Sequence, residues 1–436
     1  MNSKILNTNN NLANFKNGIW LYFFLLLFEG AIRKWLLPQL ANPLLLVRDP
    51  LVIYLLLSAS FNRLIFFNNY LFYTFCICII SFIATMFVGH GNIFVAIYGA
   101  RIFLLHFPMI FLIGKIFDKD DVIKMGRVII YISIPMSILI AIQFFSPQSA
   151  WVNKGIGDSF GSGFSGAMGY LRPSATFSFT SGTTSFFSLV AVFIFYFWIE
   201  SQKINRLILS IATIALLLSI PFSISRSLLF QILISLIFTF IGTNFIKQRI
   251  NKVATLVLGF GLLIFLLNLF EIFSIGVKVF SNRFEKANTT EGGIESVLLD
   301  RYLGGLINAL GSSTNQPFLG YGLGYGSNVG SSILTNKIAF LISEGEWGRL
   351  IGELGPILGL AIILIRLLMS LKLTYWAWQY LKINDTLPWI ILSFTLLILP
   401  QGGWSQPTSL GFSVLVTGLL IASFKSNNLT ENSIEK

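Results

Sequence analysis

The sequence contains little charge. Only 11% of its 436 residues are charged, against about 25% in an ordinary soluble domain, whereas 55% are apolar. Apolar runs recur along the whole chain, for example at residues 20–28, 70–88 and 253–270, and several approach the roughly 20 residues needed to span a bilayer. This composition excludes a soluble domain of useful size. It predicts an all-α polytopic membrane protein, with residues 1–436 forming a single integral membrane domain.

Cysteine and histidine are also scarce. Cys76 and Cys78 lie two residues apart in an apolar segment, so on a helix they point about 200° apart and cannot bond to each other. Two histidines, His90 and His106, are too few for a His-rich metal site, and residues 118–121 lack the spacing of an EF-hand loop. We therefore expect neither a metal nor another cofactor.

Hydropathy predicts about twelve membrane spans. Arg48 and Asp49 interrupt the second span, so residues 31–47 could instead lie along the membrane interface ahead of a short span, which would leave about eleven. The predicted spans lie near residues 18–37, 44–58, 70–88, 92–114, 128–146, 178–199, 205–220, 227–244, 253–275, 347–370, 387–400 and 407–424.

Lysine and arginine are distributed unevenly among the predicted loops. With the N-terminus in the cytoplasm, most of them, Arg366 included, fall on the cytoplasmic side, as the positive-inside rule expects. Both termini are then cytoplasmic, and residues 425–436 form a cytoplasmic tail. The long loops 147–177 and 276–346 lie outside, the second between spans nine and ten. This arrangement accounts for the net charge of +12 without a nucleic acid partner.

Glycine alternates with larger residues in the second external loop. Residues 317–326 read Pro-Phe-Leu-Gly-Tyr-Gly-Leu-Gly-Tyr-Gly. A dinucleotide fingerprint needs a further glycine three residues after a Gly-x-Gly, and a P-loop needs Gly-Lys-Ser/Thr; the segment has neither. ATP is absent from the outer face, where lipid-linked pyrophosphates are found. The segment is therefore either a flexible turn or a loop that approaches another anion.

Three arginines occupy distinctive positions on the predicted outer side. Arg172 precedes the sixth span, Arg226 stands between two serines at the start of the eighth, and Arg301 precedes the glycine segment. A guanidinium can bond two phosphate oxygens at once. Arg226 has the strongest local argument, because a helix N-terminus favours an anion. Each arginine could instead be an interfacial side chain whose charged end reaches water.

Acidic residues follow the glycine segment. If a helix begins near Glu344, then Glu346, Arg349 and Glu353 share one of its faces. A carboxylate there could accept a proton from a sugar hydroxyl if its pKa were raised toward neutrality. The alternative is that Glu346 and Arg349 only pair with each other and begin the helix.

Ionisable residues also occur inside predicted spans. Glu29 and Arg33 are four residues apart and are expected to pair. Arg101 and His106 are five apart, about 140° on an α-helix, so that helix alone would not bring them into one site.

The order of these features between about residue 165 and residue 400 resembles the O-antigen polymerase and O-antigen ligase family of bacterial membrane glycosyltransferases. The resemblance rests on the Arg172 segment, the Ser225-Arg226-Ser227 helix start, the external loop with Arg301, the glycine segment, and the Glu353-Leu-Gly355 helix after it. It implies a class C, metal-independent architecture in the inner membrane. The glycan donor would be undecaprenyl pyrophosphate-linked and would be used at the outer face.

The resemblance also implies roles for individual residues. Arg226 and Arg301 would hold the pyrophosphate, with Arg172 a weaker third. Ligase-like members place a histidine near the end of the long loop as the presumed base, but this sequence has none after His106. Glu346, or Glu344, is our substitute for that base. The remaining substrate contacts are assigned to Arg349, Gly320, Tyr321, Gly322, Gly324 and Tyr325, with the tyrosine rings facing sugars.

The function predicted on this basis is polymerisation of a surface polysaccharide, by transfer of glycan to a sugar hydroxyl. An O-antigen ligase, with lipid A-core or another acceptor, is the alternative; the missing histidine favours the polymerase. A transporter of polysaccharide or lipid-linked sugar would be expected to carry coupling charges near the membrane midplane in repeated halves. The sequence has one clear midplane cation, Arg101, and no obvious internal repeat.

Overall fold

The structure is a computed structural model that describes residues 2–64, 68–157, 164–200, 203–244, 250–291, 311, 316–337, 341–343 and 345–425. Within these ranges every regular element is a helix, and the β-contact between Ser165 and Leu171 is an isolated bridge. Eight helices are long and apolar enough to cross a bilayer, or up to nine if a bent pair is one span. The all-α polytopic membrane architecture is confirmed.

Short 3-10 or π segments are labelled η. In chain order the elements are α1 (Asn2–Ala31), η1 (Ile32–Leu36), η2 (Pro38–Leu40), η3 (Pro43–Leu46), α2 (Arg48–Phe61), α3 (Asn69–Phe87), α4 (Ile93–Arg101), η4 (Ile102–His106), α5 (Phe107–Ile116), α6 (Lys119–Phe145), η5 (Trp151–Asn153), α7 (Thr180–Ile199), α8 (Arg206–Phe222), α9 (Arg226–Asn244), α10 (Ile250–Asn268), α11 (Glu271–Glu291), α14 (Asn328–Thr335), α15 (Glu346–Leu354), α16 (Pro356–Lys382), α17 (Leu387–Ile398) and α18 (Pro407–Ser423).

Each predicted span coincides with helical structure, but two of them are divided into separate helices. In place of a straight span at 253–275, α10 and α11 meet at an angle of 104°, and α11 continues to Glu291, into the predicted external loop. In place of a span at 347–370, the chain forms two helices separated by Gly355. Gly355 has φ +82°, and a Cβ there would lie 2.1 Å from the carbonyl oxygen of Phe318. Pro356 then begins α16, because its fixed φ suits the first helical position.

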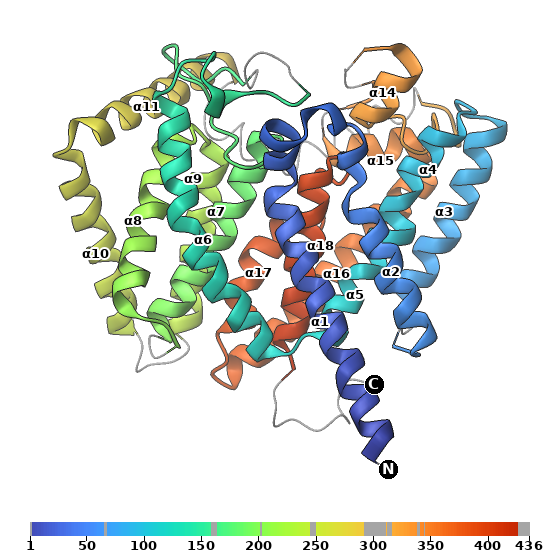
Figure 1. Cartoon of the computed structure of the whole chain (residues 1–436), viewed down its shortest axis with the longest axis horizontal. Helices are drawn as coiled ribbons and strands as arrows, with labels where there is room; N and C mark the ends of the chain where they lie inside the picture. Colours follow the sequence, from blue (N-terminus) through green and yellow to red (C-terminus); the bar gives the residue numbers. More distant parts are fainter. Residues whose placement is uncertain are drawn as a thin grey trace.

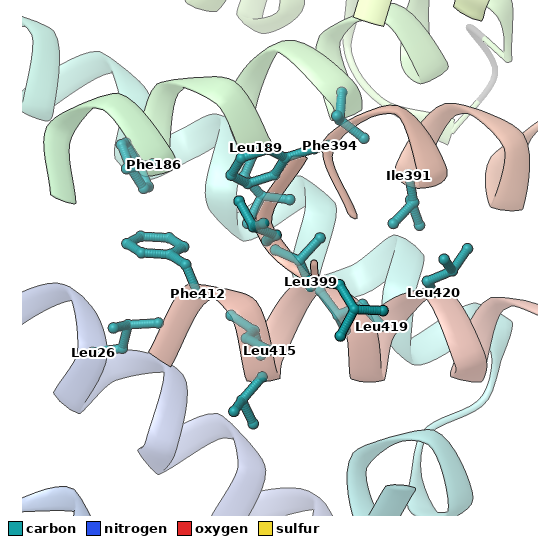
Figure 2. Close-up of a cluster of buried hydrophobic side chains, with 14 of the residues drawn as sticks. Leu26, Phe186, Leu189, Ile391, Phe394, Leu399, Phe412, Leu415, Leu419 and Leu420 are labelled. Atoms are coloured by element: carbon teal, nitrogen blue, oxygen red, sulfur yellow. The ribbon is translucent and has the colours of Figure 1, made fainter. Parts of the chain in front are cut away.

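The core is built around α18, which lies in the middle of the bundle (Figure 1). It packs on α5, α17 and α7, and Figure 2 shows Leu26 of α1 and Phe186 of α7 near Phe412 of α18, and Phe394 of α17 near Leu189 of α7. A helix that is apolar on all sides is buried by its neighbours. Because protein surrounds them, α17 and α18 can be shorter than a lipid-facing span.

The start of α1 and the end of α18 lie at the same end of the bundle (Figure 1). Lys16 of α1 pairs with Asp118 just before α6 at 3.1 Å, and Lys425 donates to the carbonyl oxygen of Phe117 at 3.3 Å. We call this the terminal end. The opposite, distal end carries α14 and α15. Beyond Lys425, the predicted cytoplasmic tail lies outside the described residues.

Glu29 pairs with two arginines. Its carboxylate lies 3.3 Å from Arg33, which confirms the expected pair, and 3.2 Å from Arg48 of α2. All three side chains are buried. Arg48 also donates to the carbonyl oxygen of Pro407, at the start of α18. The Arg48 charge that interrupts the second predicted span is therefore paired inside the bundle.

Asp49 is held by Arg101 and His106. Both carboxylate oxygens lie 2.9 Å from Nη1 of Arg101, and Nε2 of His106 lies 3.0 Å from Oδ1. The expected 140° separation assumed a regular α-helix, but residues 102–106 form the π-helical turn η4. Its i to i+5 hydrogen bonds bring residues five apart to nearly the same face. The fourth span thus presents both side chains to α2.

Replacing Asp49 tests whether this buried contact stabilises the bundle. We expect Asp49→Asn to lower the free energy of unfolding by about 3–5 kcal/mol, because it leaves the Arg101 charge buried without a counter-ion. Glu271→Gln is the matched control, since Glu271 is exposed at the start of α11 and its loss should change stability by less than about 0.5 kcal/mol. Thermal unfolding in detergent measures both. Equal melting temperatures for the two variants would contradict the assignment.

Candidate functional site

Four charged side chains form a closed cluster between α15 and α16. Arg349 contacts Glu346 through Nε at 2.9 Å and Nη2 at 2.7 Å, and contacts Glu353 through Nη1 at 2.6 Å. Arg366 of α16 lies 2.8 Å from Glu346. The three residues of α15 meet because spacings of three and four place them on one helical face. With two carboxylates and two guanidiniums, this acid–arginine cluster is balanced in charge.

Arg366 corrects an expectation from the sequence. It was assigned to the cytoplasmic side, on the assumption that the tenth span runs through residues 347–370. Because the chain reverses at Gly355, α15 packs back against α16. Arg366 is consequently 1% exposed and lies beside Glu346.

Trp404, which the sequence analysis missed, completes the cluster. Its backbone N–H donates to Glu346 Oε2 at 3.1 Å, and its ring lies 3.9 Å from the Arg366 guanidinium carbon. Trp347 of α15 donates from Nε1 to the carbonyl oxygen of Pro400 at 2.9 Å. The irregular segment between α17 and α18 is therefore attached to α15 at two points. Because Trp404 is distant from Arg366 in the sequence, no local sequence pattern could have predicted this cation–π contact.

The pKa of Glu346 is lowered. Burial by itself would raise the pKa of this carboxyl, but the guanidiniums of Arg349 and Arg366 outweigh that effect and keep the group ionised at neutral pH. The stability gained from this ionised form is present above the ordinary glutamate pKa and is lost as the pH falls through the lower folded-state value. Both carboxylate oxygens also accept hydrogen bonds. A carboxylate that accepts a proton in the reaction would need a raised pKa, whereas the pKa of Glu346 is lowered.

The glycine segment, residues 317–326, packs against the C-terminal end of α15. The N–H of Tyr321 donates to the carbonyl oxygen of Gly352 at 2.8 Å, and that of Gly322 to the carbonyl oxygen of Glu353 at 3.0 Å. Gly326 donates to the Glu353 carboxylate at 2.9 Å. The last carbonyls of a helix lack partners within the helix. Here the N–H groups of the glycine segment are the partners of these carbonyls. The glycine-rich backbone therefore packs against another part of the protein.

The other side of the glycine segment contacts α3 and α4. Leu323 N–H donates to Thr85 Oγ1 at 2.9 Å, and a Cβ on Gly324 would lie 2.3 Å from the carbonyl oxygen of Val95. A Cβ on Gly99 of α4 would lie 2.3 Å from the Gly324 nitrogen. Glycine is required on both sides of this contact because the two backbones touch. The segment therefore links α15 to α3 and α4.

Three aromatic rings stack beside the glycine segment. The rings of Tyr321 and Tyr325 are 5.2 Å apart, and those of Tyr325 and His90 are 6.2 Å apart. Tyr321 is 36% exposed and can offer its outer surface to a ligand. His90, between α3 and α4, accepts at Nδ1 from the N–H of Asn92 and contacts the Leu323 carbonyl oxygen at 3.0 Å. The fold thus brings a histidine to the glycine segment from far upstream.

Arg172 and Arg226 are positioned near the first turns of α7. The carbonyl oxygen of Pro173 accepts from Thr183 at 3.3 Å. Ser225, which precedes Arg226, contacts Thr184 Oγ1 at 2.9 Å and accepts from the third residue of α9 at 3.3 Å. The predicted helix start at residue 226 is confirmed.

The α7 region and the acid–arginine cluster are joined by the segment between α17 and α18. Ser181 of α7 donates to Gln406 Oε1 at 3.3 Å, two residues after Trp404. Arg301 and Glu344, the other two charged residues assigned to the site, lie outside the described residues. Among the described residues, no group of three or more His, Cys, Asp or Glu side chains could hold a metal ion.

Comparison with known proteins adds no assignment. No protein-family model matches the chain, and no curated protein matches it.

Two glycines with nearly equal dihedral angles separate backbone strain from packing. Gly324 has φ +81° and contacts α4, whereas Gly169 has φ +83° and open space, with no atom within 4 Å of where its Cβ would lie. We expect Gly169→Ala to cost only the left-handed strain of about 1–2 kcal/mol. Gly324→Ala should lower the melting temperature further, because its new methyl group would displace the backbone of α4. Equal melting temperatures in the two variants would refute this packing role.

A double-mutant cycle tests the charge balance of the acid–arginine cluster. Glu346→Gln leaves one excess positive charge, Arg366→Gln leaves one excess negative charge, and the double variant leaves Arg349 paired with Glu353. We therefore expect a coupling free energy of about 0.5–3 kcal/mol, with the double variant less destabilised than the sum of the single variants. Chemical denaturation of the purified protein measures it. Additive effects would show that Glu346 and Arg366 do not stabilise each other.

Proposed function

We propose that the protein polymerises a bacterial surface polysaccharide at the outer face of the inner membrane. In this proposal about twelve helices cross the membrane, the N-terminus is cytoplasmic, and the architecture is that of a class C, metal-independent glycosyltransferase. Glycan passes from an undecaprenyl-pyrophosphate donor to a sugar hydroxyl. Support comes from the eight long apolar helices and from the order of motifs that resembles O-antigen polymerases and ligases.

The observation that carries the proposal is the connection between the separate candidate motifs. The Arg172 and Arg226 segments both adjoin α7, and α7 is joined through Ser181 and Gln406 to the segment that bonds Glu346. The glycine segment packs on the same α15 that carries Glu346. One group of connected elements therefore carries cations for a pyrophosphate and an aromatic ring for a sugar.

The proposed reaction needs stabilisation of its leaving group. An acceptor hydroxyl attacks the anomeric carbon of the donor sugar, and the bond to the pyrophosphate breaks. Arg226 and Arg301 stabilise the negative charge that develops on the departing pyrophosphate, with Arg172 as a weaker third contact. Losing one preorganised donor of this kind typically costs about 10²–10³ in rate.

The geometry of Glu346 favours a role other than that of the general base. Glu346 is 5% exposed and bonds Arg349, Arg366 and Trp404, so it is better suited to positioning α15 than to taking a proton. Glu344 remains our candidate for the general base, which would contribute about 10²–10⁴ in rate. Because N–H groups of the glycine segment already donate to α15, we assign sugar contact to the exposed ring of Tyr321.

Substitution of the arginines tests the proposed function. Arg226→Ala and Arg301→Ala should each abolish detectable polymer, because the leaving-group charge loses a donor. Arg206→Ala is a matched control: Arg206 also begins a helix, is exposed, and should retain full polymer length. The measurement is glycan chain length on gels at equal protein levels. Wild-type chains in both test variants would remove the assignment.

Two further measurements separate the alternatives. Deletion of a polymerase leaves short single-unit chains, whereas deletion of a ligase leaves long unattached chains. With purified protein and lipid-linked oligosaccharide, an enzyme releases the pyrophosphate carrier and a transporter does not.

A further inference from the structure

A small basic cavity lies at the terminal end of the bundle, away from the proposed site. Its volume is about 190 Å³, and it is lined by Asp120, Ile123, Lys124 and Arg127 of α6 and by Lys203, between α7 and α8. Among the described lining residues, three cations face one carboxylate. The volume is below the roughly 300–1,000 Å³ of pockets for drug-sized ligands, so the cavity suits a small charged group.

Two of the acidic residues near the cavity are committed to other contacts. Asp118 and Asp121 form the capping box of α6, each accepting from the other's backbone N–H. Lys16 lies 2.5 Å from Asp121 and 3.1 Å from Asp118. Lys124 is 3.9 Å from Asp121, at the outer limit of an ion pair. The capping box also occupies N–H groups of α6, so attraction for an anion must come from the side chains.

Arg127 and Lys203 both indicate that an anion would be favourable. Nε of Arg127 is buried without a hydrogen-bond partner among the described residues, and a buried donor normally has one. Lys203 donates to the hydroxyl of Tyr196 at 2.9 Å. Burial and the nearby charge of Lys119 lower the pKa of Lys203, and the carboxylates of Glu200, Asp385 and Asp120 only partly oppose this effect. A bound anion would satisfy the unpartnered guanidinium donor of Arg127.

An apolar stripe on α6 continues from the cavity. Lys124, Tyr131, Ile138 and Phe145 are spaced by seven residues, about two helical turns, and so lie on nearly the same face. The side chain of Lys124 is 63% exposed, and the three apolar residues are 46%, 57% and 43% exposed. α6 is long and apolar enough to cross a bilayer, so this exposed stripe is available for contact with lipid.

We infer that this cavity binds the headgroup phosphate of an anionic phospholipid whose acyl chains lie along the exposed face of α6. The basic side chains supply the charge, the unpartnered Arg127 Nε supplies a directed donor, and the stripe supplies the apolar contact that a free phosphate could not use. Basic pockets at the cytoplasmic ends of membrane helices are suited to such headgroups. The inference does not depend on the proposed enzymatic function.

Lipid binding to the purified full-length protein tests the inference. Phosphatidylglycerol is titrated against the protein in neutral detergent, with phosphatidylcholine as the zwitterionic comparison; retained lipid is counted by native mass spectrometry and thermal stability is followed in parallel. We expect phosphatidylglycerol to be retained and to raise the melting temperature. Arg127→Gln combined with Lys203→Gln should weaken its binding by about tenfold or more. Lys382→Gln, an exposed residue at the same end that does not line the cavity, should bind as the wild type does.

Each arm has an outcome that would overturn the inference. Equal retention of phosphatidylglycerol and phosphatidylcholine would refute headgroup recognition, and wild-type binding by the double variant would refute this location. If inorganic phosphate displaces phosphatidylglycerol and stabilises the protein equally, the ligand is a soluble anion and the lipid assignment fails. Should the double variant not fold, Lys124→Gln at the exposed rim is the substitute and should weaken binding in the same assay.

Discussion

The structure depends on the requirement that a carboxylate buried among apolar helices must have a partner of opposite sign. Glu346 meets this requirement through contacts with three parts of the chain. Its carboxylate pairs with Arg349 on the same helix and Arg366 on the next, and it accepts the N–H of Trp404 from the connection between α17 and α18. Three separate parts of the chain are fixed to one another by a single ionised group. Glu29 does the same for α1, α2 and the start of α18, through Arg48.

The two irregular segments beside α15 have their backbone polar groups hydrogen-bonded to neighbouring helices. Within the apolar part of a membrane protein, non-helical backbone is tolerated only where protein or water satisfies its polar groups. The glycine segment meets this condition by donating to carbonyls of α15, and its lack of side chains lets α4 approach on the other side. The residues between α17 and α18 meet it by bonding α15 and α7. These connections hold the distal end together as one unit.

The two ends of the bundle differ in how completely their charges are paired. In the acid–arginine cluster, carboxylates and guanidiniums balance, which favours rigid positioning of the elements around it. In the cavity beside α6, cations outnumber carboxylates among the described lining residues. Balanced charges stabilise a structure, whereas an excess of one sign attracts a ligand of the opposite sign. The two proposals therefore concern separate parts of the protein and can fail separately.

The sequence by itself determined the features that depend on neighbouring residues. Hydropathy identified the helical segments, and the 3.6-residue period identified the pairs of Glu29 with Arg33 and of Glu346 with Arg349. Tertiary structure alone decided the partners that come from other helices. Arg366 reaches Glu346 because the chain reverses at Gly355. Asp49 contacts both Arg101 and His106 because a π-helical turn brings these two side chains to nearly the same face. Hydropathy and helical period describe one segment at a time, whereas these contacts depend on how segments pack, so no local pattern encodes them.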